Sequence, residues 1–200
     1  MRRHAWVALL MLLPLHASAA AQPALPNSEP SAADSASERR IEGNGHKAFV
    51  GKVRSIADGD SIVVEDAEGY RAKVRLFGID APERGGGTKY GQPYAQRARK
   101  NLSELIYRKT VRVQWHTYDS YGRMIGQVWL DSADVGLRQI CDGYAWLFRQ
   151  YADELSGRDR KAYAECEETA RAQRRGLWRD SRPVPPWEWR HSDRSKELEP

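Results

Sequence analysis

The sequence predicts an α+β protein in which a five-stranded β-barrel is capped by about three helices. Two observations carry this prediction: five short runs are rich in β-branched and aromatic residues, and three stretches have apolar residues at helical spacing. The first helical stretch falls between the third and fourth strands, and the other two follow the fifth strand. Strands interrupted in this way indicate a small Greek-key barrel, for which the OB-fold is the leading candidate.

The first three strands are expected at residues 47–57, 61–66 and 70–79. The sequences "DGD" and "AEG" separate them, and both favour tight turns because Asp and Gly adopt the required backbone conformations readily. Short strands joined by tight turns predict an antiparallel meander. In chain order, the remaining expected elements are a helix at 93–109, strands at 110–118 and 123–131, a short helix from 135 to near Gly143, and a helix from 157 that stops at Gly176.

Both ends of the chain are expected to lie outside the barrel domain, which we assign to residues 46–182. Residues 1–21 have the basic start, apolar run and Ala-rich end of a secretory signal peptide, and the run is shorter than the roughly 20 residues needed to span a bilayer. Residues 22–45 are small and polar, as is typical of a flexible leader. Residues 183–200 form a Pro/Trp-rich and then charged tail, interpreted as structural or linker sequence. We therefore expect an exported protein, periplasmic or secreted, with no membrane association after signal removal.

Charge and cysteine content narrow the chemistry further. The net charge is +5 with a sequence pI near 9.3, and removing Arg2 and Arg3 with the signal lowers it to +3. This modest excess suits an anionic partner such as nucleic acid. Export exposes Cys141 and Cys166 to oxidation together, so a disulfide between them is expected. The histidines do not pair with a Cys or another His at zinc-like spacing, which argues against a zinc site.

Two aspartates are expected to meet at one rim of the barrel. Because the second and third strands form a hairpin, the start of one lies beside the end of the other, which brings Asp60 near Asp80. Two carboxylates at this distance repel each other, and a divalent cation would relieve the repulsion. Oxygen ligands without His or Cys favour calcium or magnesium. Pro82 fixes the turn after Asp80 and leaves the Ala81 carbonyl available as a further ligand.

Arginines complete the expected site. Strict alternation would put Arg75 and Asp80 on opposite faces of a strand. For both to face one site, Gly78 or the turn must break the alternation. Arg123 enters from "DSYGR", the connection between the fourth and fifth strands. Two guanidiniums facing a cation suit phosphoryl chemistry, because forked donors bind phosphate oxygens in pairs. Glu83 would act as the base that takes a proton from water.

The motifs together resemble the thermonuclease, or staphylococcal-nuclease-like, family. They are "ADGDSIVV", "VRLFGIDAPE", "YGQPYAQRAR", "DSYGRMIGQVWL", "GYAW" and "GLW", in the family's order and approximate spacing over about residues 47–180. The resemblance implies an OB-fold nuclease that hydrolyses DNA and RNA with calcium as cofactor. Carried over by motif, it implies metal binding by Asp60, Asp80 and the Ala81 carbonyl, phosphate binding by Arg75 and Arg123, and general-base catalysis by Glu83.

The resemblance also implies substrate contacts. Tyr121 matches the tyrosine before the turn arginine and Tyr151 matches a nucleotide-stacking tyrosine, whereas Arg149 stands where the family has another. Lys89 and Tyr90 lie in "RGGGTKYG", expected to be a mobile basic flap over the substrate.

The expected substrates are DNA and RNA, with single-stranded or denatured forms preferred, and the expected state is a monomer. The alternative is a catalytically silent OB-fold module that binds nucleic acid or protein. The complete carboxylate and arginine set favours the enzyme, as it also does over an OB-fold with an unrelated periplasmic ligand.

Overall fold

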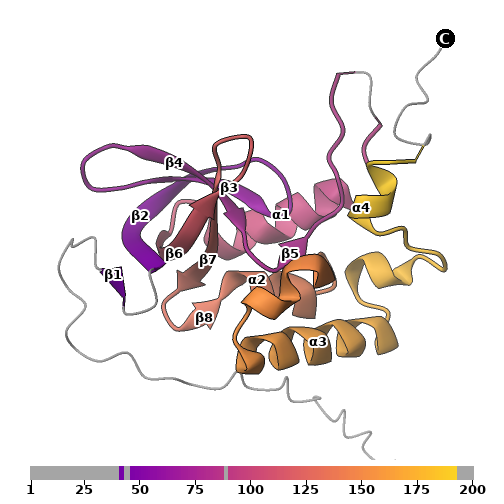
Figure 1. The fold of residues 1–200 in the computed structure, drawn as a ribbon. Helices are drawn as coiled ribbons and strands as arrows, with labels where there is room; N and C mark the ends of the chain where they lie inside the picture. The colour runs from indigo at the N-terminus through magenta and orange to yellow at the C-terminus, as the bar shows by residue number, and fades with distance from the viewer. Residues whose placement is uncertain (1–40, 43–45, 88–89, 193–200) are drawn as a thin grey trace, which may run out of the picture.

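Five strands close into a mixed β-barrel in the computed structural model, which describes residues 41–42, 46–87 and 90–192 (Figure 1). Around the barrel the order is β2-β3-β4-β7-β6, and β6 pairs back onto β2. The β4–β7 pair is parallel and the other pairs are antiparallel. The strands are β2 (His46–Ile56), β3 (Ser61–Glu65), β4 (Arg71–Leu76), β6 (Thr110–Tyr118) and β7 (Met124–Leu130). This confirms the predicted five-stranded OB-fold barrel.

Alternating burial along the strands produces the barrel core. Ile62 and Val64 of β3 face inward with Ala72 and Val74 of β4, and all four are almost completely buried. Two register shifts, in β2 and in β6, introduce the local bends that closing a small barrel requires. Gly126 of β7 is needed for close packing, because a Cβ there would lie 2.6 Å from the Gln114 carbonyl oxygen.

Four two-residue strands accompany the barrel: β1 (Ile41–Glu42), β5 (Ile79–Asp80), β8 (Ala133–Asp134) and β9 (Trp146–Leu147). The β5–β9 pair forms a separate small sheet. Gly78 lies between β4 and β5 with φ of 77°, a left-handed conformation that a glycine adopts without strain. The chain therefore leaves the barrel at Gly78 and breaks the strand alternation that would have separated Arg75 from Asp80.

Three helices cap the barrel, α1 (Ala95–Ile106), α2 (Val135–Cys141) and α3 (Gly157–Ala172), as expected in number. Figure 1 shows α2 between the barrel and α3. The turns η1 (Arg149–Glu154) and η2 (Gly176–Arg179) and the short helix α4 (Pro186–Trp189) follow α2 and α3. The expected end of the last helix at Gly176 is wrong, because α3 stops at Ala172. The chain instead turns so that the Leu177 amide donates to the Gly143 carbonyl at 2.8 Å, and Leu177 is buried in η2.

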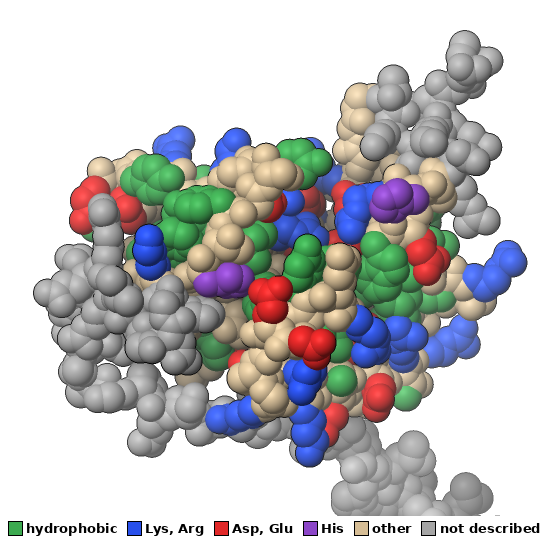
Figure 2. Space-filling model, in the orientation of Figure 1, with side chains coloured by type: hydrophobic (Ala, Val, Ile, Leu, Met, Phe, Trp, Pro, Cys, Tyr) green, Lys and Arg blue, Asp and Glu red, His purple; other side chains and the backbone are tan. Residues whose placement is uncertain are grey.

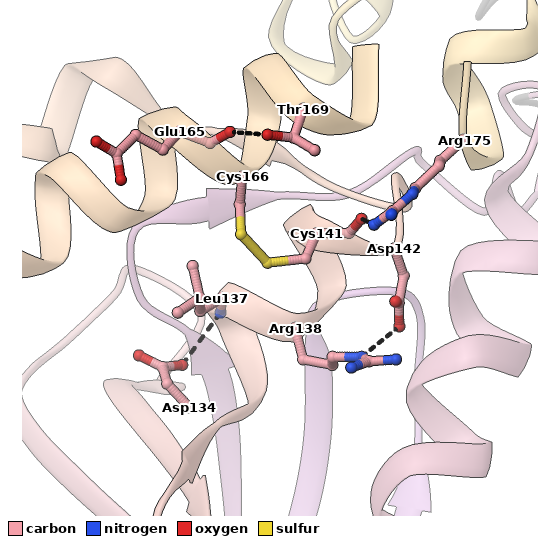
Figure 3. Close-up of a disulfide and its surroundings, with 9 residues drawn as sticks. All are labelled: Asp134, Leu137, Arg138, Cys141, Asp142, Glu165, Cys166, Thr169 and Arg175. Atoms are coloured by element: carbon pink, nitrogen blue, oxygen red, sulfur yellow. Dashed lines mark hydrogen bonds and ion pairs between the residues drawn. A yellow bond between two sulfur atoms is a disulfide. The ribbon is translucent and has the colours of Figure 1, made fainter. Parts of the chain in front are cut away.

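A disulfide links the two helices that follow the barrel. Cys141 at the end of α2 and Cys166 in α3 are bonded, with their Cα atoms 4.6 Å apart (Figure 3). The predicted pairing is therefore present in the structure. Closing the loop between Cys141 and Cys166 stabilises the fold by about 3 kcal/mol in the chain-entropy account.

The described part of the tail packs on the domain. Trp189 of α4 is 8% exposed, and the Trp187 ring lies 5.8 Å from the Trp146 ring. The side chain of Gln92, before α1, donates to the Val184 carbonyl at 2.5 Å. This packing brings α4 beside the loop that connects β5 to α1 (Figure 1). Within the described ranges, no helix has the length and apolar character needed to cross a bilayer.

Candidate active site

The candidate site lies at the barrel rim where β3 begins and β4 ends. Ser61 pairs with Arg75 across these strands, and the Leu76 amide donates to the Asp60 carbonyl at 2.8 Å. This register brings Asp60 beside the end of β4. After the turn at Gly78, Asp80 returns to the same rim in β5 and is fully buried. The expected meeting of the two aspartates therefore follows from the β3–β4 hairpin and the backbone conformation of Gly78.

Arg75 joins the two aspartates directly. Its Nη1 donates to Asp60 Oδ1 at 2.9 Å, and its Nη2 donates to Asp80 Oδ1 at 2.5 Å. The remaining oxygen of Asp60 accepts from the Ala81 amide at 2.9 Å, and Oδ1 also accepts from the Ser61 hydroxyl at the same distance. The repulsion between the carboxylates, which the sequence suggested a metal would relieve, is thus relieved by a guanidinium in this structure.

A second arginine, Arg190, reaches the same carboxylates from the residue after α4. Its Nη2 donates to Asp80 Oδ2 at 2.9 Å, while Nη1 donates to Asp80 Oδ1 at 3.2 Å and to Glu83 Oε1 at 2.5 Å. Sequence reasoning missed this residue. Arg190 is separated from Asp80 by 110 positions, and nothing in "PPWEWRH" indicates which surface the tail covers.

Burial and charge pull the aspartate pKa values in different directions. Burial, and then the nearby charge of Asp60, raises the pKa of Asp58 to about 7. Burial also opposes ionisation of Asp60, but the charge of Arg75 and hydrogen bonds from its neighbours lower the pKa of that carboxyl. The pKa of Asp80 is raised, chiefly by burial and then by the charge of Asp60, against the opposing effect of the two arginines. Asp60 is therefore the most firmly ionised of the three.

Arg123 contacts Ser61, the residue after Asp60, from the turn between β6 and β7. The turn that carries it is built by Asp119, whose Oδ1 accepts from the Tyr121 and Arg123 amides at 2.9 Å. Arg123 Nε donates to Asp119 Oδ2 at 2.7 Å, and Nη1 donates to the Ser61 hydroxyl at 3.2 Å. The guanidinium also lies 5.5 Å from the centre of the Tyr121 ring. Arg123 is thus fixed next to the residue that follows Asp60.

These groups line a cavity of about 660 Å³. Figure 2 shows acidic and basic side chains meeting in a recess between the barrel and the C-terminal segment. Asp80 is buried and lies behind Arg75 and Arg190. Both arginines line the cavity, and both donate to the Asp80 carboxylate. Seven residues singled out from the sequence line the cavity: Asp60, Arg75, Ala81, Glu83, Tyr121, Arg123 and Tyr151.

One of the expected substrate contacts, Tyr90, is not brought to this cavity. Tyr90 is 46% exposed and is absent from the lining, and Lys89 lies outside the described residues. Arg149, which stands where a family tyrosine was expected, donates to the buried carboxylate of Glu167 at 2.8 Å. Arg149 therefore binds α3 and does not line the cavity.

The cavity wall also contains residues that the sequence analysis did not single out, among them Asp58, His116, Tyr118, Phe148 and Glu154. Asp58 had a visible signal, because it shares the "DGD" turn with Asp60. His116 and Tyr118 are two positions apart in β6. The face of the strand on which they lie could not be assigned from the sequence, because it depends on where the strand bends.

A hard cation fits the donor chemistry here better than a soft one. Asp58, Asp60 and Asp80 offer only oxygen ligands, and the Ala81 backbone lies against Asp60. However, the described residues contain no group of three or more His, Cys, Asp or Glu side chains already arranged around a metal position. Both Asp80 oxygens accept from Arg190, so a cation would have to share or displace that contact. Few protein ligands remain, and calcium and magnesium commonly complete their shells with water.

Comparison with known proteins decides the family. Residues 73–180 match the family described as staphylococcal nuclease homologue. An uncharacterized endonuclease of Escherichia coli O157:H7 is 37% identical over 142 residues, which cover 70% of this chain and 84% of that protein. The chain belongs to the staphylococcal nuclease homologue family. Another relative, an uncharacterized endonuclease of Haemophilus influenzae, is 32% identical over 72% of this chain and 74% of its own length. A micrococcal nuclease of Shigella flexneri is 35% identical over 74% of this chain and 83% of its own length.

Family membership agrees with the fold of the site. The matched residues begin within β4, include the Gly78 turn, β5 and the turn that carries Arg123, and end after η2. Asp60 and Arg190 lie outside the matched range on either side, yet both contact residues within it. The barrel domain of this chain is therefore completed by β2 and β3 before the matched range, and the site also includes a residue that follows the short helix α4 after it.

Proposed function

We propose that this protein is an exported, calcium-dependent nuclease that hydrolyses phosphodiester bonds of DNA and RNA with little sugar specificity. The observation that carries the proposal is the cavity, in which Arg75, Arg123 and the carboxylates of Asp60 and Glu83 line one space within a nuclease-family barrel. The relatives described as endonucleases and a micrococcal nuclease support the same class of reaction. We expect single-stranded or denatured substrates to be preferred and the protein to act as a monomer.

Asp60, Asp80 and the Ala81 carbonyl are the groups that we assign to hold calcium. Their chemistry supports this, because all three are hard oxygen donors gathered at one rim of the barrel. When bound, calcium would supply a Lewis acid that polarises a phosphoryl oxygen and offsets negative charge.

Arg75 and Arg123 are assigned to the phosphate. A guanidinium has five N–H donors, and Arg123 uses Nε and one hydrogen of Nη1 in its contacts to Asp119 and Ser61. Its remaining donors can bind phosphate oxygens while the side chain stays fixed. Arg75 likewise keeps its Nε and one hydrogen on each Nη. Donors fixed in this way stabilise the charge that develops in the transition state without reorganising.

Glu83 is assigned as the general base. Its Oε1 accepts from Arg190, so we assign Oε2 as the atom that takes a proton from the attacking water. Tyr121 is 80% exposed at the cavity rim and Tyr151 is 44% exposed, so either ring is accessible for stacking on a base. Lys89 and Tyr90 remain assigned to a flap that meets the substrate from the neighbouring loop.

Export to the periplasm or beyond is supported by the N-terminal sequence pattern and by the disulfide, since structural disulfides persist in oxidising compartments. Fractionating cells that express the full chain, and the chain without residues 1–21, tests this part of the proposal. Recovery of both forms in the cytoplasm would contradict it.

The activity is tested with purified protein beginning at residue 22, using denatured DNA, duplex DNA and RNA with calcium, magnesium or chelator. We expect both nucleic acids to be digested with calcium only, and denatured DNA faster than duplex. An Arg123→Ala protein prepared identically controls for contaminating nuclease. Binding of single strands without cleavage would favour the silent OB-fold module, and cleavage in chelator would remove calcium from the proposal.

A further inference from the structure

The Glu83 loop and the C-terminal segment are held together by one buried side chain. Gln92 is 6% exposed, and its backbone amide donates to the Glu83 carbonyl at 2.7 Å while its side-chain oxygen accepts from the Glu83 amide at 3.1 Å. The side-chain nitrogen of Gln92 donates to the Val184 carbonyl. The backbone of the proposed base and the segment that leads into α4 therefore share one polar anchor.

The residue before Arg190 fixes the other end of this arrangement. Trp189 is buried, and the amides of Trp189 and Arg190 donate to the Pro185 and Pro186 carbonyls at 2.9 and 3.0 Å. Pro185 and Pro186 have φ fixed by their rings, which limits the freedom of the segment. The Arg190 side chain thus extends from an anchored backbone, which keeps it directed at the site.

The Arg190 guanidinium bridges two carboxylates that would otherwise repel each other. It donates to both oxygens of Asp80 and to Oε1 of Glu83, and the Arg190 and Glu83 side chains are 35% and 34% exposed. Without this contact, a half-exposed glutamate beside a buried aspartate would be pushed away and would sample several rotamers. The bridge therefore fixes both the position and the orientation of Glu83.

We propose that Arg190 is a positioning residue for the proposed nuclease reaction, holding the Glu83 carboxylate beside Asp80 so that its free oxygen can accept a proton. This inference rests on the proposed function for its catalytic meaning, but the contact itself does not. Arg190 also opposes calcium, because it places a positive charge on a proposed calcium ligand. Removing it should therefore change turnover and calcium affinity in opposite directions.

The central test is Arg190→Gln, measured by calorimetric calcium titration and by steady-state kinetics at saturating calcium. We expect calcium affinity to rise on the order of 10-fold, since one opposed unit charge is removed near a divalent ion. We expect kcat to fall at least about 10-fold, part of the roughly 10²- to 10⁴-fold contribution of a positioned proton acceptor, with a smaller change in KM. Arg190→Lys keeps the charge without the fork and should restore part of the rate.

Arg182→Gln is the matched control, because Arg182 is an exposed arginine in the same segment and is absent from the cavity lining. It should leave kcat and calcium affinity unchanged. Since Arg190 is proposed to act through Glu83, adding Arg190→Gln to a Glu83→Gln protein should lower kcat by less than about 3-fold further, a non-additivity expected of coupled residues.

Three results would overturn the proposal. Unchanged or faster turnover of Arg190→Gln at saturating calcium would make Arg190 a competitor of calcium and nothing more. Parallel losses of calcium affinity, melting temperature and kcat would make its role structural. Full additivity with Glu83→Gln would show that it does not act through Glu83.

Failure of the proposed function is seen separately, as absence of calcium-dependent cleavage by the unmodified protein. In that case, a double-mutant cycle on urea unfolding of the metal-free protein still decides whether Arg190 and Glu83 interact. A zero coupling between them in that cycle would also overturn the positioning role.

Discussion

Replacing Asp80 with asparagine tests both the electrostatics and the metal assignment of the site. Asp80 is fully buried and accepts three hydrogen bonds, one from Arg75 and two from Arg190. Asparagine has the same shape but no charge. From the sequence alone, Asp60 and Asp80 were expected to repel each other without metal, so the substitution would cost the fold little. In the structure, however, the carboxylate accepts from both arginines, and the amide nitrogen of asparagine cannot do so. The substitution should therefore cost stability even though burial and Asp60 raise the pKa of Asp80.

The size of the expected loss of stability depends on which carboxylates each arginine still contacts after the substitution. Breaking a buried ion pair by removing one partner costs about 3–5 kcal/mol. In Asp80→Asn, Arg75 retains Asp60 and Arg190 retains Glu83, so neither guanidinium is left without a carboxylate. Because burial and the charge of Asp60 raise the pKa of Asp80, removing its charge offsets part of this cost. We therefore expect the free energy of unfolding of the metal-free protein to fall by about 2 kcal/mol, chiefly from lost hydrogen bonds. Most of the wild-type fold should persist, because a typical domain has about 5–15 kcal/mol of stability.

Urea unfolding with chelator and with calcium separates the two effects. If calcium binds as proposed, a concentration about 100 times its dissociation constant should stabilise the unmodified protein by about 2.7 kcal/mol, and the gain for Asp80→Asn should be much smaller at the same concentration. The control is Asp153→Asn, since the Asp153 side chain is 94% exposed and its pair with Arg160 should matter by under about 1 kcal/mol. Unchanged metal-free stability would refute the argument from the buried pairs. An undiminished calcium gain would remove Asp80 from the metal ligands.

Three further predictions concern the arginines, the base and a buried carboxyl. Arg75→Lys and Arg123→Lys should each lower turnover on the order of 10²-fold, because lysine keeps the charge but loses the forked donors; near-parental kinetics for both would make these arginines surface cations only. Glu83→Gln should be slow at neutral pH with a rate that climbs with pH as hydroxide replaces the base; rescue of its whole defect by added calcium would exclude the base role. Burial raises the pKa of Asp134 to about 6 from 3.8, so the folded state binds the extra proton and the free energy of unfolding should fall by about 2 kcal/mol as pH rises from about 4 to 6. Urea unfolding across that range should show the fall in the unmodified protein and a smaller one in Asp134→Asn; identical slopes would contradict it.

Local pattern was sufficient to predict the barrel. The five strands each carry alternating or β-branched apolar residues, and the "DGD" and "AEG" turns fix the neighbours of β3, so the β2–β3–β4 meander could be assigned from sequence. The parallel β4–β7 contact could not, because it depends on where the chain goes after leaving β4. The end of α3 was missed for a related reason. Helical spacing continues past Ala172, but the contact of Leu177 with Gly143 of another segment ends the helix.

Within the site, the sequence predicted which charges meet better than it predicted how they pair. The hairpin and Gly78 bring Asp60, Arg75 and Asp80 together, as their spacing indicated. The sequence analysis assigned Arg75 to an incoming phosphate, whereas in the structure its two Nη atoms hold two aspartates. Direct pairing depends on distances of a few tenths of an ångström, and residue order does not determine these.

Arg190 changes the charge balance on which the mechanism depends. Asp60, Asp80, Glu83 and Asp119 bring four negative charges to the site, and Arg75, Arg190 and Arg123 bring three positive ones. A divalent cation added to this set creates an excess of positive charge, which an incoming phosphodiester can neutralise. Arginines that would weaken the proposed calcium binding in the free protein would then strengthen it once substrate is present. Substrate and calcium should therefore bind cooperatively, each raising the affinity of the other by the same factor.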